Sequence, residues 1–224
     1  MPAHATNQRI YEQFARIGKA LAAPGRLELI DLLAQGERPV DALAREATMS
    51  IANASQHLRV LHAARLVDTR REGQRVYYRL AAPAVVNLWL ALRSTAESQL
   101  AELEEIALDY LGASETLEPI DRDELARRIA AGTVIVIDVR PPEEFEQGHI
   151  AGAVSVPLRK LKAWARAAPK RRPIVAYCRG PYCVFAVQAV AELQKLGLRA
   201  MRSADGVAEW RAAGLPVERG ERTP

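Results

Sequence analysis

The chain has 224 residues, enough for two domains of ordinary size that each bury a core of their own. Its content of 49% hydrophobic and 26% charged residues is typical of a soluble globular protein, and no apolar run reaches membrane-spanning length. Residues 1–6 lack the charged and then apolar layout of a signal peptide, so we expect a cytoplasmic protein with no membrane partner.

The net charge of +4 is unevenly distributed along the chain. Residues 1–112 carry 13 Lys or Arg and 13 Asp or Glu, whereas residues 113–224 carry 18 and 14. A nucleic-acid contact needs a basic stretch, although a mixed solvated surface explains the charge alone equally well. Residues 45–80 hold seven arginines against three acidic residues: Arg45, Arg59, Arg65, Arg70, Arg71, Arg75 and Arg79 against Glu46, Asp68 and Glu72.

Residues 7–111 carry mainly helical patterns. Apolar residues recur at spacings of three and four between Ile10 and Leu21, which predicts an amphipathic helix that ends before Pro24 and Gly25. Three more helices are predicted at residues 26–34, 40–47 and 51–64.

A hairpin follows the fourth helix, and Ser50 is placed to cap that helix. Residues 67–70 and 76–79 have strand character and flank a turn that contains Gly73. Three helices, a recognition-type helix and a hairpin wing predict a mainly α winged helix-turn-helix domain over residues 1–112.

A long helix is predicted from about Pro83 to Leu111. Its apolar residues approach a heptad seam that is broken around Gln99 and Leu100. A helix of this length has a second face to bury, so we expect it to form a homodimer interface together with the first helix. The alternative is that it packs only on its own domain or on the second one.

Residues 113–118 predict a short linker, and beyond it strands and helices alternate over residues 119–224. The runs 134–137 and 174–176 are continuously apolar, as in parallel strands that are covered on both faces. We therefore predict an α/β domain with a parallel sheet. Its strands are expected at residues 133–138, 153–156, 173–177 and 199–201, and its helices at residues 121–131, 142–147, 158–165, 184–196 and 207–213.

The fourth helix and the hairpin carry the side chains that we expect to contact DNA. A plain surface helix more often shows Glu and Lys pairs, whereas this helix has polar residues beside its apolar stripe that can reach base edges and phosphates. These helical residues are Asn53, Ser55, Gln56, His57 and Arg59. The hairpin adds residues suited to phosphate or minor-groove contact: Arg70, Arg71, Arg75 and Tyr77.

The run 55–61 (Ser-Gln-His-Leu-Arg-Val-Leu) and the run 71–80 (Arg-Glu-Gly-Gln-Arg-Val-Tyr-Tyr-Arg-Leu) give residues 8–112 their likeness to a known family. This segment resembles the ArsR/SmtB family of bacterial repressors. The resemblance implies a dimer that binds operator DNA of dyad symmetry and is released by an inducer. Half-sites in this geometry lie about one helical turn (~34 Å) apart, or a multiple of it.

The metal sites of that family have no counterpart in this sequence. Members that sense arsenic or lead carry Cys-x-Cys in the third-helix region, and members that sense zinc pair Asp and His along the last helix. Residues 40–44 here are Val-Asp-Ala-Leu-Ala, and residues 83–111 contain no His or Cys. His57 and His62 are five residues apart on one helix and do not converge. We therefore expect no metal site and no cofactor.

Both cysteines, Cys178 and Cys183, lie in one short segment between an apolar strand and an apolar helix. A turn of this kind directs backbone N–H groups, a helix N-terminus and Arg179 at one sulfur, which lowers the pKa of a thiol and makes it a nucleophile. In a reducing cytoplasm, two such cysteines are better explained as reactive than as a structural bond. A reactive thiol joined to a DNA reader suggests a chemical sensor. The alternative for Cys178 is a small buried hydrophobe.

Two further runs carry a second resemblance. The run 138–158, with Asp-Val-Arg-Pro-Pro-Glu-Glu-Phe at its start and Gly-His-Ile-Ala-Gly-Ala in its middle, resembles the N-terminal signature of rhodanese domains, and residues 206–217 resemble their C-terminal signature. We expect His149 to be structural, holding the loop before Ala151, rather than a catalytic base, and Trp210 to be a core residue. The resemblance implies a persulfide on Cys178 and an active-site loop of Arg179, Gly180, Pro181, Tyr182 and Cys183.

Cys183 departs from the rhodanese pattern. Many rhodaneses place Arg or Lys there to hold an anionic donor, and Pro181 removes one N–H, so efficient thiosulfate transfer is in doubt. A phosphatase or arsenate-reductase variant would need a longer loop closed by Arg. Cys183 can attack a persulfide or sulfenate on Cys178 and form a disulfide or polysulfide bridge. The alternative is a residue of the first helical turn that packs inward.

These patterns predict a DNA-binding transcription regulator, a repressor by resemblance. A small sulfur-containing or thiol-reactive inducer would modify Cys178 and change the affinity for operator DNA. A second hypothesis is a working sulfurtransferase with an ancillary DNA-binding domain, and a third is a catalytically silent interaction module. Turnover with a sulfur donor and acceptor separates the second from the others, and regulation in Cys178→Ser separates the first from the third.

Overall fold

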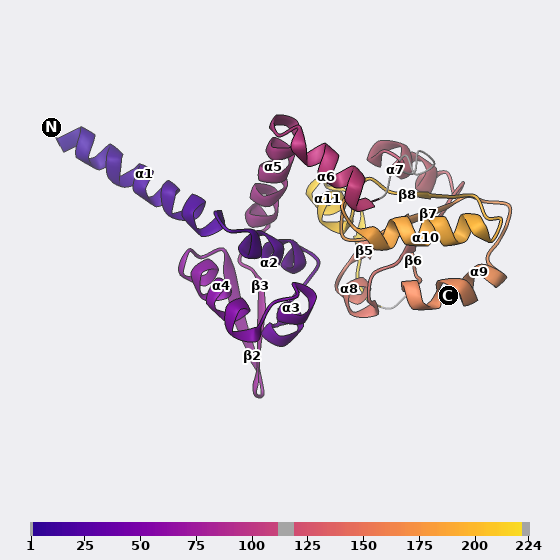
Figure 1. Cartoon of the computed structure of the whole chain (residues 1–224), viewed down its shortest axis with the longest axis horizontal. Helices are drawn as coiled ribbons and strands as arrows, with labels where there is room; N and C mark the ends of the chain where they lie inside the picture. The colour runs from indigo at the N-terminus through magenta and orange to yellow at the C-terminus, as the bar shows by residue number, and fades with distance from the viewer. Residues whose placement is uncertain (1, 112–118, 221–224) are drawn as a thin grey trace. The chain divides into compact units, whose positions relative to one another are not determined.

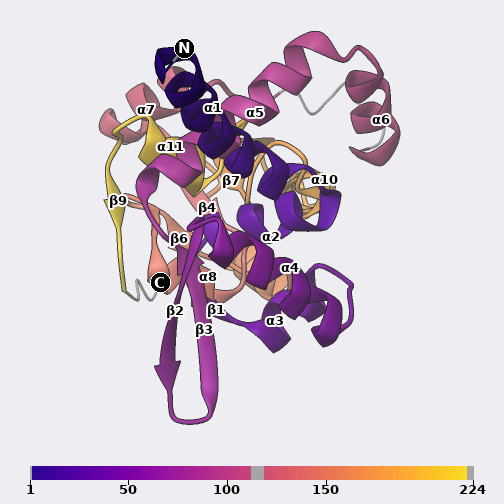
Figure 2. The same ribbon diagram turned by 90° about the vertical axis from the view of Figure 1, so that its left-hand side faces the viewer.

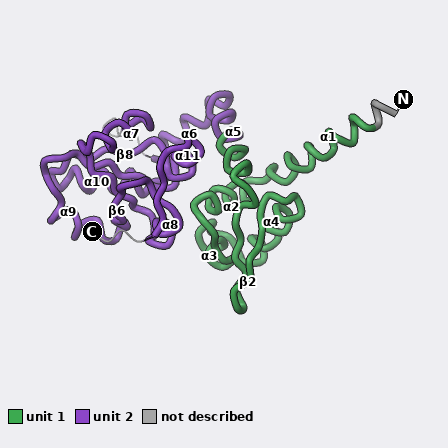
Figure 3. Tube along the Cα trace, turned by 180° about the vertical axis from the view of Figure 1, so that it is seen from behind, with its two compact units in different colours: residues 1–91 green, residues 92–224 purple. Residues whose placement is uncertain are grey.

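The computed structural model describes residues 2–111 and 119–220 (Figure 1). Its contacts divide the chain into two compact units, residues 1–91 and residues 92–224 (Figure 3). The linker predicted at residues 113–118 lies outside the described residues. Among the helices that are described, none is long and apolar enough to span a membrane.

Unit 1 consists of helices and a small antiparallel sheet. The helix α5 belongs to both units, because the boundary between them falls after Ala91. The elements of unit 1 in chain order are α1 (Pro2–Leu21), α2 (Pro24–Ala34), β1 (Arg38–Pro39), α3 (Val40–Glu46), α4 (Ile51–Ala63), β2 (Val67–Glu72), β3 (Arg75–Leu80) and the start of α5 (Pro83–Gln99).

Local sequence explains where these elements begin and turn. Pro24 occupies the first turn of α2, where its missing N–H costs nothing. The Ser50 hydroxyl accepts a hydrogen bond from the Asn53 N–H at 3.2 Å and so caps α4. Gly73 has a φ of +59° in the turn between β2 and β3, a conformation that glycine adopts without strain. The predicted helices and hairpin of this unit are confirmed.

The hairpin pairs with a third strand that the pattern did not predict. β1 is antiparallel to β3, with Arg38 opposite Tyr78, so the sheet order is β1-β3-β2. Because β1 is so short, the rest of the hairpin extends beyond it and projects from the helices of unit 1 (Figure 2). This is the predicted wing.

A single apolar core holds unit 1 together. Trp89 of α5 packs against this core, and its indole N–H donates to the Asp31 carboxylate at 2.9 Å. The start of α5 is therefore fixed to α2. The core includes the buried residues Leu29, Ile30, Leu43, Leu58, Leu61, Val67 and Val85.

Unit 2 begins with the last turns of α5 and continues into an α/β domain. The predicted alternation of strands and helices is confirmed. Its elements are α6 (Glu102–Leu111), α7 (Arg122–Ala130), β4 (Ile135–Asp138), α8 (Pro142–Gln147), β5 (His149–Ile150), β6 (Val154–Ser155), the short 3₁₀ helix η2 (Leu158–Lys160), α9 (Leu161–Ala167), β7 (Ile174–Tyr177), α10 (Val184–Lys195), β8 (Ala200–Arg202), α11 (Val207–Ala212) and β9 (Val217–Glu218).

A four-stranded parallel sheet in the order β6-β4-β7-β8 forms the centre of unit 2. Side chains of α9 and α10 pack on one face, with Ile137 and Ile174, and side chains of α7, α8 and α11 pack on the other, with Val136 and Val175. Coverage of both faces explains the continuous apolar runs. Because the strands are parallel, the ends of β4, β6 and β7 lie along one edge, where the connecting loops gather.

The helix predicted from Pro83 to Leu111 is two helices. The last hydrogen bond of the first helix runs from the Leu100 N–H to the Ala96 carbonyl at 2.9 Å, and α6 starts at Glu102. The break falls where the heptad seam is interrupted. Three glutamates in the first turn of α6, Glu102, Glu104 and Glu105, favour a new helix N-terminus there.

The core of unit 1 gives a stability prediction. Leu58→Ala removes a fully buried side chain and should lower the free energy of the unfolding that exposes the α4 amides by about 2–5 kcal/mol. Val60→Ala on the same helix removes a side chain that is 39% exposed and should change it by about 0.5 kcal/mol or less. Hydrogen exchange of the α4 peptides measures both, and equal losses would contradict the assignment of Leu58 to the core.

Candidate functional site

The two cysteines lie in the loop between β7 and α10, at the edge where the parallel strands end. Cys178 follows Tyr177 directly and is 2% exposed. The Cys183 N–H donates to the Gly180 carbonyl at 3.2 Å, which closes a tight turn, and Cys183 precedes the first residue of α10. We call residues 178–183 the thiol loop. These are the residues that the sequence predicts as the active-site loop: Cys178, Arg179, Gly180, Pro181, Tyr182 and Cys183.

A disulfide joins Cys178 and Cys183, with their Cα atoms 6.1 Å apart. The sequence left open whether Cys183 reaches Cys178 or packs inward. The bond establishes that the loop brings the two sulfurs within bonding distance. Residues 178–183 therefore form a covalent ring.

Arg179, which the sequence predicted to direct its charge at the cysteine sulfur, forms an ion pair with a carboxylate of α8. Its guanidinium pairs with Glu144, with Nη2 2.6 Å from Oε1 and Nε 3.1 Å from the same oxygen. Glu144 is 2% exposed, and a buried carboxylate needs such a partner. The positive charge of Arg179 is therefore balanced by a residue of α8, 35 positions earlier in the chain.

A buried polar network lies below the thiol loop. Asp138 at the end of β4 accepts hydrogen bonds from Arg140 Nη2 and from the Tyr177 hydroxyl, each at 2.6 Å. Arg140 Nη2 also donates to the Gly148 carbonyl at 2.8 Å, and both Arg140 and Asp138 are fully buried. Burial and the nearby Asp138 carboxylate raise the pKa of Tyr177 well above its ordinary value, so its hydroxyl stays protonated and donates.

Trp210 is a core residue, as predicted, and His149 is buried and packed, as the structural role predicted for it requires. His149 is 1% exposed, stacks on the Phe145 ring with centroids 3.6 Å apart, and places Nδ1 2.8 Å from the Phe145 carbonyl oxygen. Trp210 is 2% exposed and its indole N–H donates to the Pro216 carbonyl at 3.0 Å.

Gly206, at the start of α11, lies against the backbone of the thiol loop. A Cβ atom at this position would stand 2.6 Å from the Arg179 carbonyl and 2.7 Å from the Cys178 oxygen, closer than real contacts allow. Only glycine fits, because both neighbours are backbone atoms. The Gly206 N–H donates to Glu209 Oε2 at 2.9 Å.

Three residues that have no role in the sequence prediction contact the thiol loop: Arg93 and Glu97 near the end of α5, and Glu209 of α11. Arg93 Nη1 lies 2.7 Å from Glu209 Oε1, and the Tyr182 hydroxyl donates to Glu97 Oε1 at 2.8 Å. Arg93 and Glu97 also face each other across one helical turn at 3.4 Å. The sequence signal that could have identified Arg93 and Glu97 is their spacing of four residues in a mostly apolar helix. We call Arg93, Glu97 and Glu209 the loop clamp.

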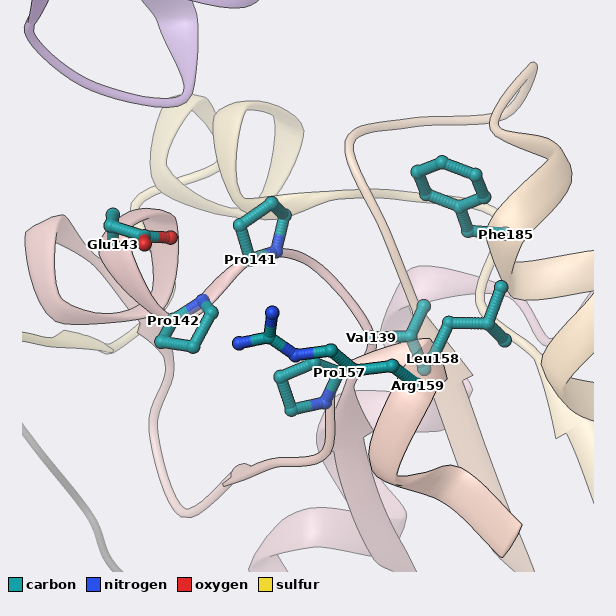
Figure 4. A pocket seen from close by; sticks show the side chains of 8 residues that line it. All are labelled: Val139, Pro141, Pro142, Glu143, Pro157, Leu158, Arg159 and Phe185. Carbon is teal, nitrogen blue, oxygen red and sulfur yellow. The ribbon is translucent and has the colours of Figure 1, made fainter.

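A cavity of about 300 Å³ opens beside the ends of β4 and β6 (Figure 4). Its walls are mainly apolar, and the Arg159 guanidinium extends toward Pro141 and Pro142 in the close view. Val139 and Leu158 of this cavity belong to the same apolar cluster as Cys178 and Cys183. The full lining is Val139, Pro141, Pro142, Glu143, Pro157, Leu158, Arg159 and Phe185.

In unit 1, α4 and the hairpin present most of the residues predicted to contact DNA. The side chains of Asn53, Gln56 and Arg59 are exposed on α4, and those of Arg71 and Arg75 are exposed on the hairpin. Ser55 on α4 and Tyr77 on β3 are partly buried.

Two of the residues predicted to contact DNA, His57 and Arg70, make contacts with other side chains or backbone of unit 1. His57 is partly buried, and a Cβ at Gly25 would lie 3.0 Å from its Nε2, so the imidazole lies against the start of α2. Arg70 pairs with Glu37 at 2.6 Å and with Glu72 at 2.8 Å, and its guanidinium stands 4.8 Å from the Tyr77 ring centroid. Neighbouring carboxylates therefore balance the charge of Arg70.

Within residues 2–111 and 119–220, no three His, Cys, Asp or Glu side chains gather in a way that could hold a metal ion.

Comparison with known proteins matches each half of the chain to a family. Residues 23–69 match the bacterial regulatory protein, arsR family, and residues 121–213 match the rhodanese-like domain. A sulfurtransferase of Allochromatium vinosum is 33% identical over 100 residues, which cover 44% of this chain and 92% of that protein. A solved homodimeric winged helix-turn-helix DNA-binding domain of Mycobacterium bovis is 43% identical and covers 42% of this chain and 88% of its own, with a TM-score of 0.41.

One relative matches both halves together. The HTH-type transcriptional regulator Rv0324 of Mycobacterium tuberculosis is 46% identical over 211 residues, which cover 94% of this chain and 92% of the relative. With the two family matches in the same order, this similarity shows that the chain belongs to the ArsR family of bacterial transcriptional regulators and carries a rhodanese-like domain behind its winged helix.

Proposed function

We propose that this regulator is an operator-binding repressor whose thiol loop detects sulfane sulfur or another small thiol-reactive inducer. The observation that carries the proposal is the Cys178–Cys183 bond, because it brings two thiols together in a protein that also has a DNA-reading domain. The bond gives the loop two chemically distinct states, a dithiol and a disulfide. A change of state is what a sensor must convert into a change of DNA affinity.

A hydropersulfide, R–S–SH, can act as the oxidant that converts the two thiols into the disulfide. The Cys178 thiolate attacks the outer sulfur, forms a new S–S bond and releases R–S⁻, which leaves Cys178–S–SH. The Cys183 thiolate then attacks the Cys178 sulfur, forms the disulfide and releases HS⁻. In sum, two protein thiols are oxidised while R–S–SH is reduced to R–SH and H₂S.

DNA binding is proposed for α4 and the hairpin, as the sequence predicts. The exposed side chains of Asn53, Gln56 and Arg59 support base and phosphate contact from a helix in the major groove. Arg71 and Arg75 on the wing support phosphate or minor-groove contact.

A homodimer is proposed through α1, together with α5. Ile10, Tyr11 and Phe14 of α1 are 48%, 63% and 64% exposed, and the rings of Tyr11 and Phe14 meet edge to face. Apolar side chains gathered in this way on one helix are typical of an interaction surface. A second copy of the chain, which an operator of dyad symmetry requires, would cover them.

A second candidate function is sulfurtransfer to an external acceptor. The similarity to the Allochromatium vinosum sulfurtransferase favours it, and so does the cavity at the ends of β4 and β6, whose residues Val139 and Leu158 share an apolar cluster with Cys178 and Cys183. In this case the acceptor thiolate, rather than Cys183, attacks the outer sulfur of the Cys178 persulfide. Cys183 would then compete with turnover.

The sensor proposal predicts a response that depends on Cys178. DNA duplexes are selected from a random-sequence pool, once with the reduced protein and once with the protein treated with inorganic polysulfide. We expect treatment to change the affinity for the selected duplex by up to about a hundredfold, or about 2.7 kcal/mol. Cys178→Ser should bind the duplex and lose the response.

Intact mass on the same samples distinguishes the alternatives. Cys183→Ser, as the matched variant, should gain sulfur but form no internal disulfide. If the wild-type mass changes while its DNA affinity does not, the thiols carry out enzyme chemistry alone. A full response in Cys178→Ser would also contradict the sensor.

The ion pairs of Arg70 predict a difference between two wing arginines. Arg75→Ala should weaken binding to all duplexes and reduce the slope of log affinity against log salt by about 1, because it removes one phosphate contact. Arg70→Ala should change the slope less, since Glu37 and Glu72 already balance its charge. Fluorescence anisotropy across a salt series measures both, and equal slopes would exclude this difference.

The dimer proposal predicts that Phe14→Asp converts the protein to a monomer and weakens binding to a palindromic duplex. A charge placed on an apolar interface must lose its water without a partner. Sedimentation velocity measures the mass, with Leu196→Asp as the control, because Leu196 is 46% exposed at the end of α10 and lies on neither helix of the proposed interface. A dimeric Phe14→Asp protein would place the interface elsewhere.

A further inference from the structure

The helix α5 carries contacts in both units of the chain. Near its middle, Trp89 donates to Asp31 and packs on the core of unit 1. One and two turns further along, Arg93 and Glu97 contact Glu209 and Tyr182 within unit 2. A single helix therefore bears residues fixed to α2 and residues that touch the thiol loop.

The first contact of the loop clamp is the Arg93–Glu209 ion pair. Both side chains are largely buried, at 15% and 4% exposed, and the pair distance is 2.7 Å. Gly180 of the thiol loop lies on this pair, since a Cβ there would stand 3.2 Å from Glu209 Oε1 and 3.5 Å from Arg93 Nη1. Through its other oxygen, Glu209 holds the N–H of Gly206, the residue that lies against the carbonyls of Cys178 and Arg179.

The second contact is the hydrogen bond from the Tyr182 hydroxyl to Glu97, at 2.8 Å. Burial and this hydrogen bond to Glu97 raise the pKa of Tyr182 to about 12. The hydroxyl therefore remains a hydrogen-bond donor to Glu97 at neutral pH.

Both loop residues that the clamp contacts, Gly180 and Tyr182, lie inside the ring closed by the disulfide. The bond fixes the Cys178 and Cys183 Cα atoms 6.1 Å apart. In the dithiol that constraint is absent, and in a persulfide an additional sulfur must be accommodated beside a Cys178 that is 2% exposed. Any of these changes therefore acts directly on the residues that the end of α5 holds.

We propose that Glu97 and Arg93 of α5 detect the chemical state of the thiol loop, and that α5 carries this state to the DNA-binding unit. The inference rests on the proposed sensor function and identifies the residues that couple the loop to the DNA reader. Disulfide or persulfide formation alters the positions of Tyr182 and Gly180, and the last turns of α5 follow because their ion pair and hydrogen bond end on these residues.

Glu97 is the side chain that tests this coupling most cleanly. Arg93 is a poor choice, because its loss would leave Glu209 buried without its partner and destabilise the loop itself. Glu97 is partly exposed, at 35%, so its replacement leaves no buried charge. Glu97→Ala removes the acceptor for Tyr182, whereas Glu97→Gln keeps an acceptor without the charge. Glu105→Ala on α6 is the matched control, because it removes an exposed glutamate from a helix.

The experiment measures, for each full-length protein, the affinity for the selected duplex before and after polysulfide treatment, with intact mass on the same samples. In Glu97→Ala we expect the same mass changes and the same affinity of the reduced protein, but a state-dependent affinity ratio at least about fivefold smaller than in wild type. Glu97→Gln should retain an intermediate ratio, and Glu105→Ala the full one.

A second measurement uses the reciprocity of coupled equilibria. If the thiol state changes DNA affinity, DNA must change the dithiol–disulfide equilibrium by the same factor, and a tenfold factor corresponds to about 30 mV in the reduction potential. The duplex should therefore shift the potential of wild type and of Glu105→Ala, and shift that of Glu97→Ala much less. A merely structural role of Glu97 would not abolish this shift selectively.

The two proposals fail in different ways. If wild type shows no change of DNA affinity on modification, the sensor function itself is wrong. If wild type responds and Glu97→Ala responds equally, the sensor stands and the clamp is not the route. A loss of response in Glu97→Ala that Glu105→Ala shares would likewise overturn the assignment to Glu97.

Discussion

The buried pair of Asp138 and Arg140 is the interaction on which the arrangement of unit 2 depends. Two charges without access to water are tolerated only when their hydrogen-bonding groups find partners, and here the Tyr177 hydroxyl and the Gly148 carbonyl complete the set. The pair thereby ties the end of β4 to the end of β7 and to the segment before β5. Removing one member of such a pair typically costs about 3–5 kcal/mol, because the other is left uncompensated. Cys178 follows Tyr177 directly, so the thiol loop starts from a fixed point.

Two further contacts hold the thiol loop, one through an ion pair and one through close backbone packing. Glu144 of α8 holds Arg179 through an ion pair, and Gly206 of α11 lies against the backbone with no side chain at all. The remaining part of the loop, Gly180–Cys183, is the part that contacts the loop clamp. Cys178 is fixed next to the buried Tyr177, and the residues up to Cys183 contact the loop clamp. This arrangement suits a site in which a change in the covalent state of the cysteines has to move neighbouring residues.

Patterns of short range were sufficient to predict most elements and the position of the thiols. Gly73 between two strand-like runs indicates the wing, Ser50 indicates the start of α4, and the two cysteines between an apolar strand and an apolar helix indicate the loop. The features that the sequence did not predict depend on contacts between distant residues or on very short elements. The partner of Arg179 is 35 positions away, β1 is too short to leave a periodic signal, and the break after Gln99 depends on competition between one long helix and two shorter ones. Ion pairs and close backbone approaches formed by tertiary contact leave no local pattern.

The depth of Cys178 bears on which molecules this protein can distinguish. In the disulfide, 2% of Cys178 is accessible, so a narrow reagent would reach a sulfur at this depth more readily than a bulky one. Small species such as hydrogen persulfide or peroxide would meet this condition more readily than glutathione disulfide or a protein disulfide. The loop would therefore act as a molecular sieve, and selectivity among oxidants would be set by their dimensions and by reaction rate rather than by equilibrium affinity.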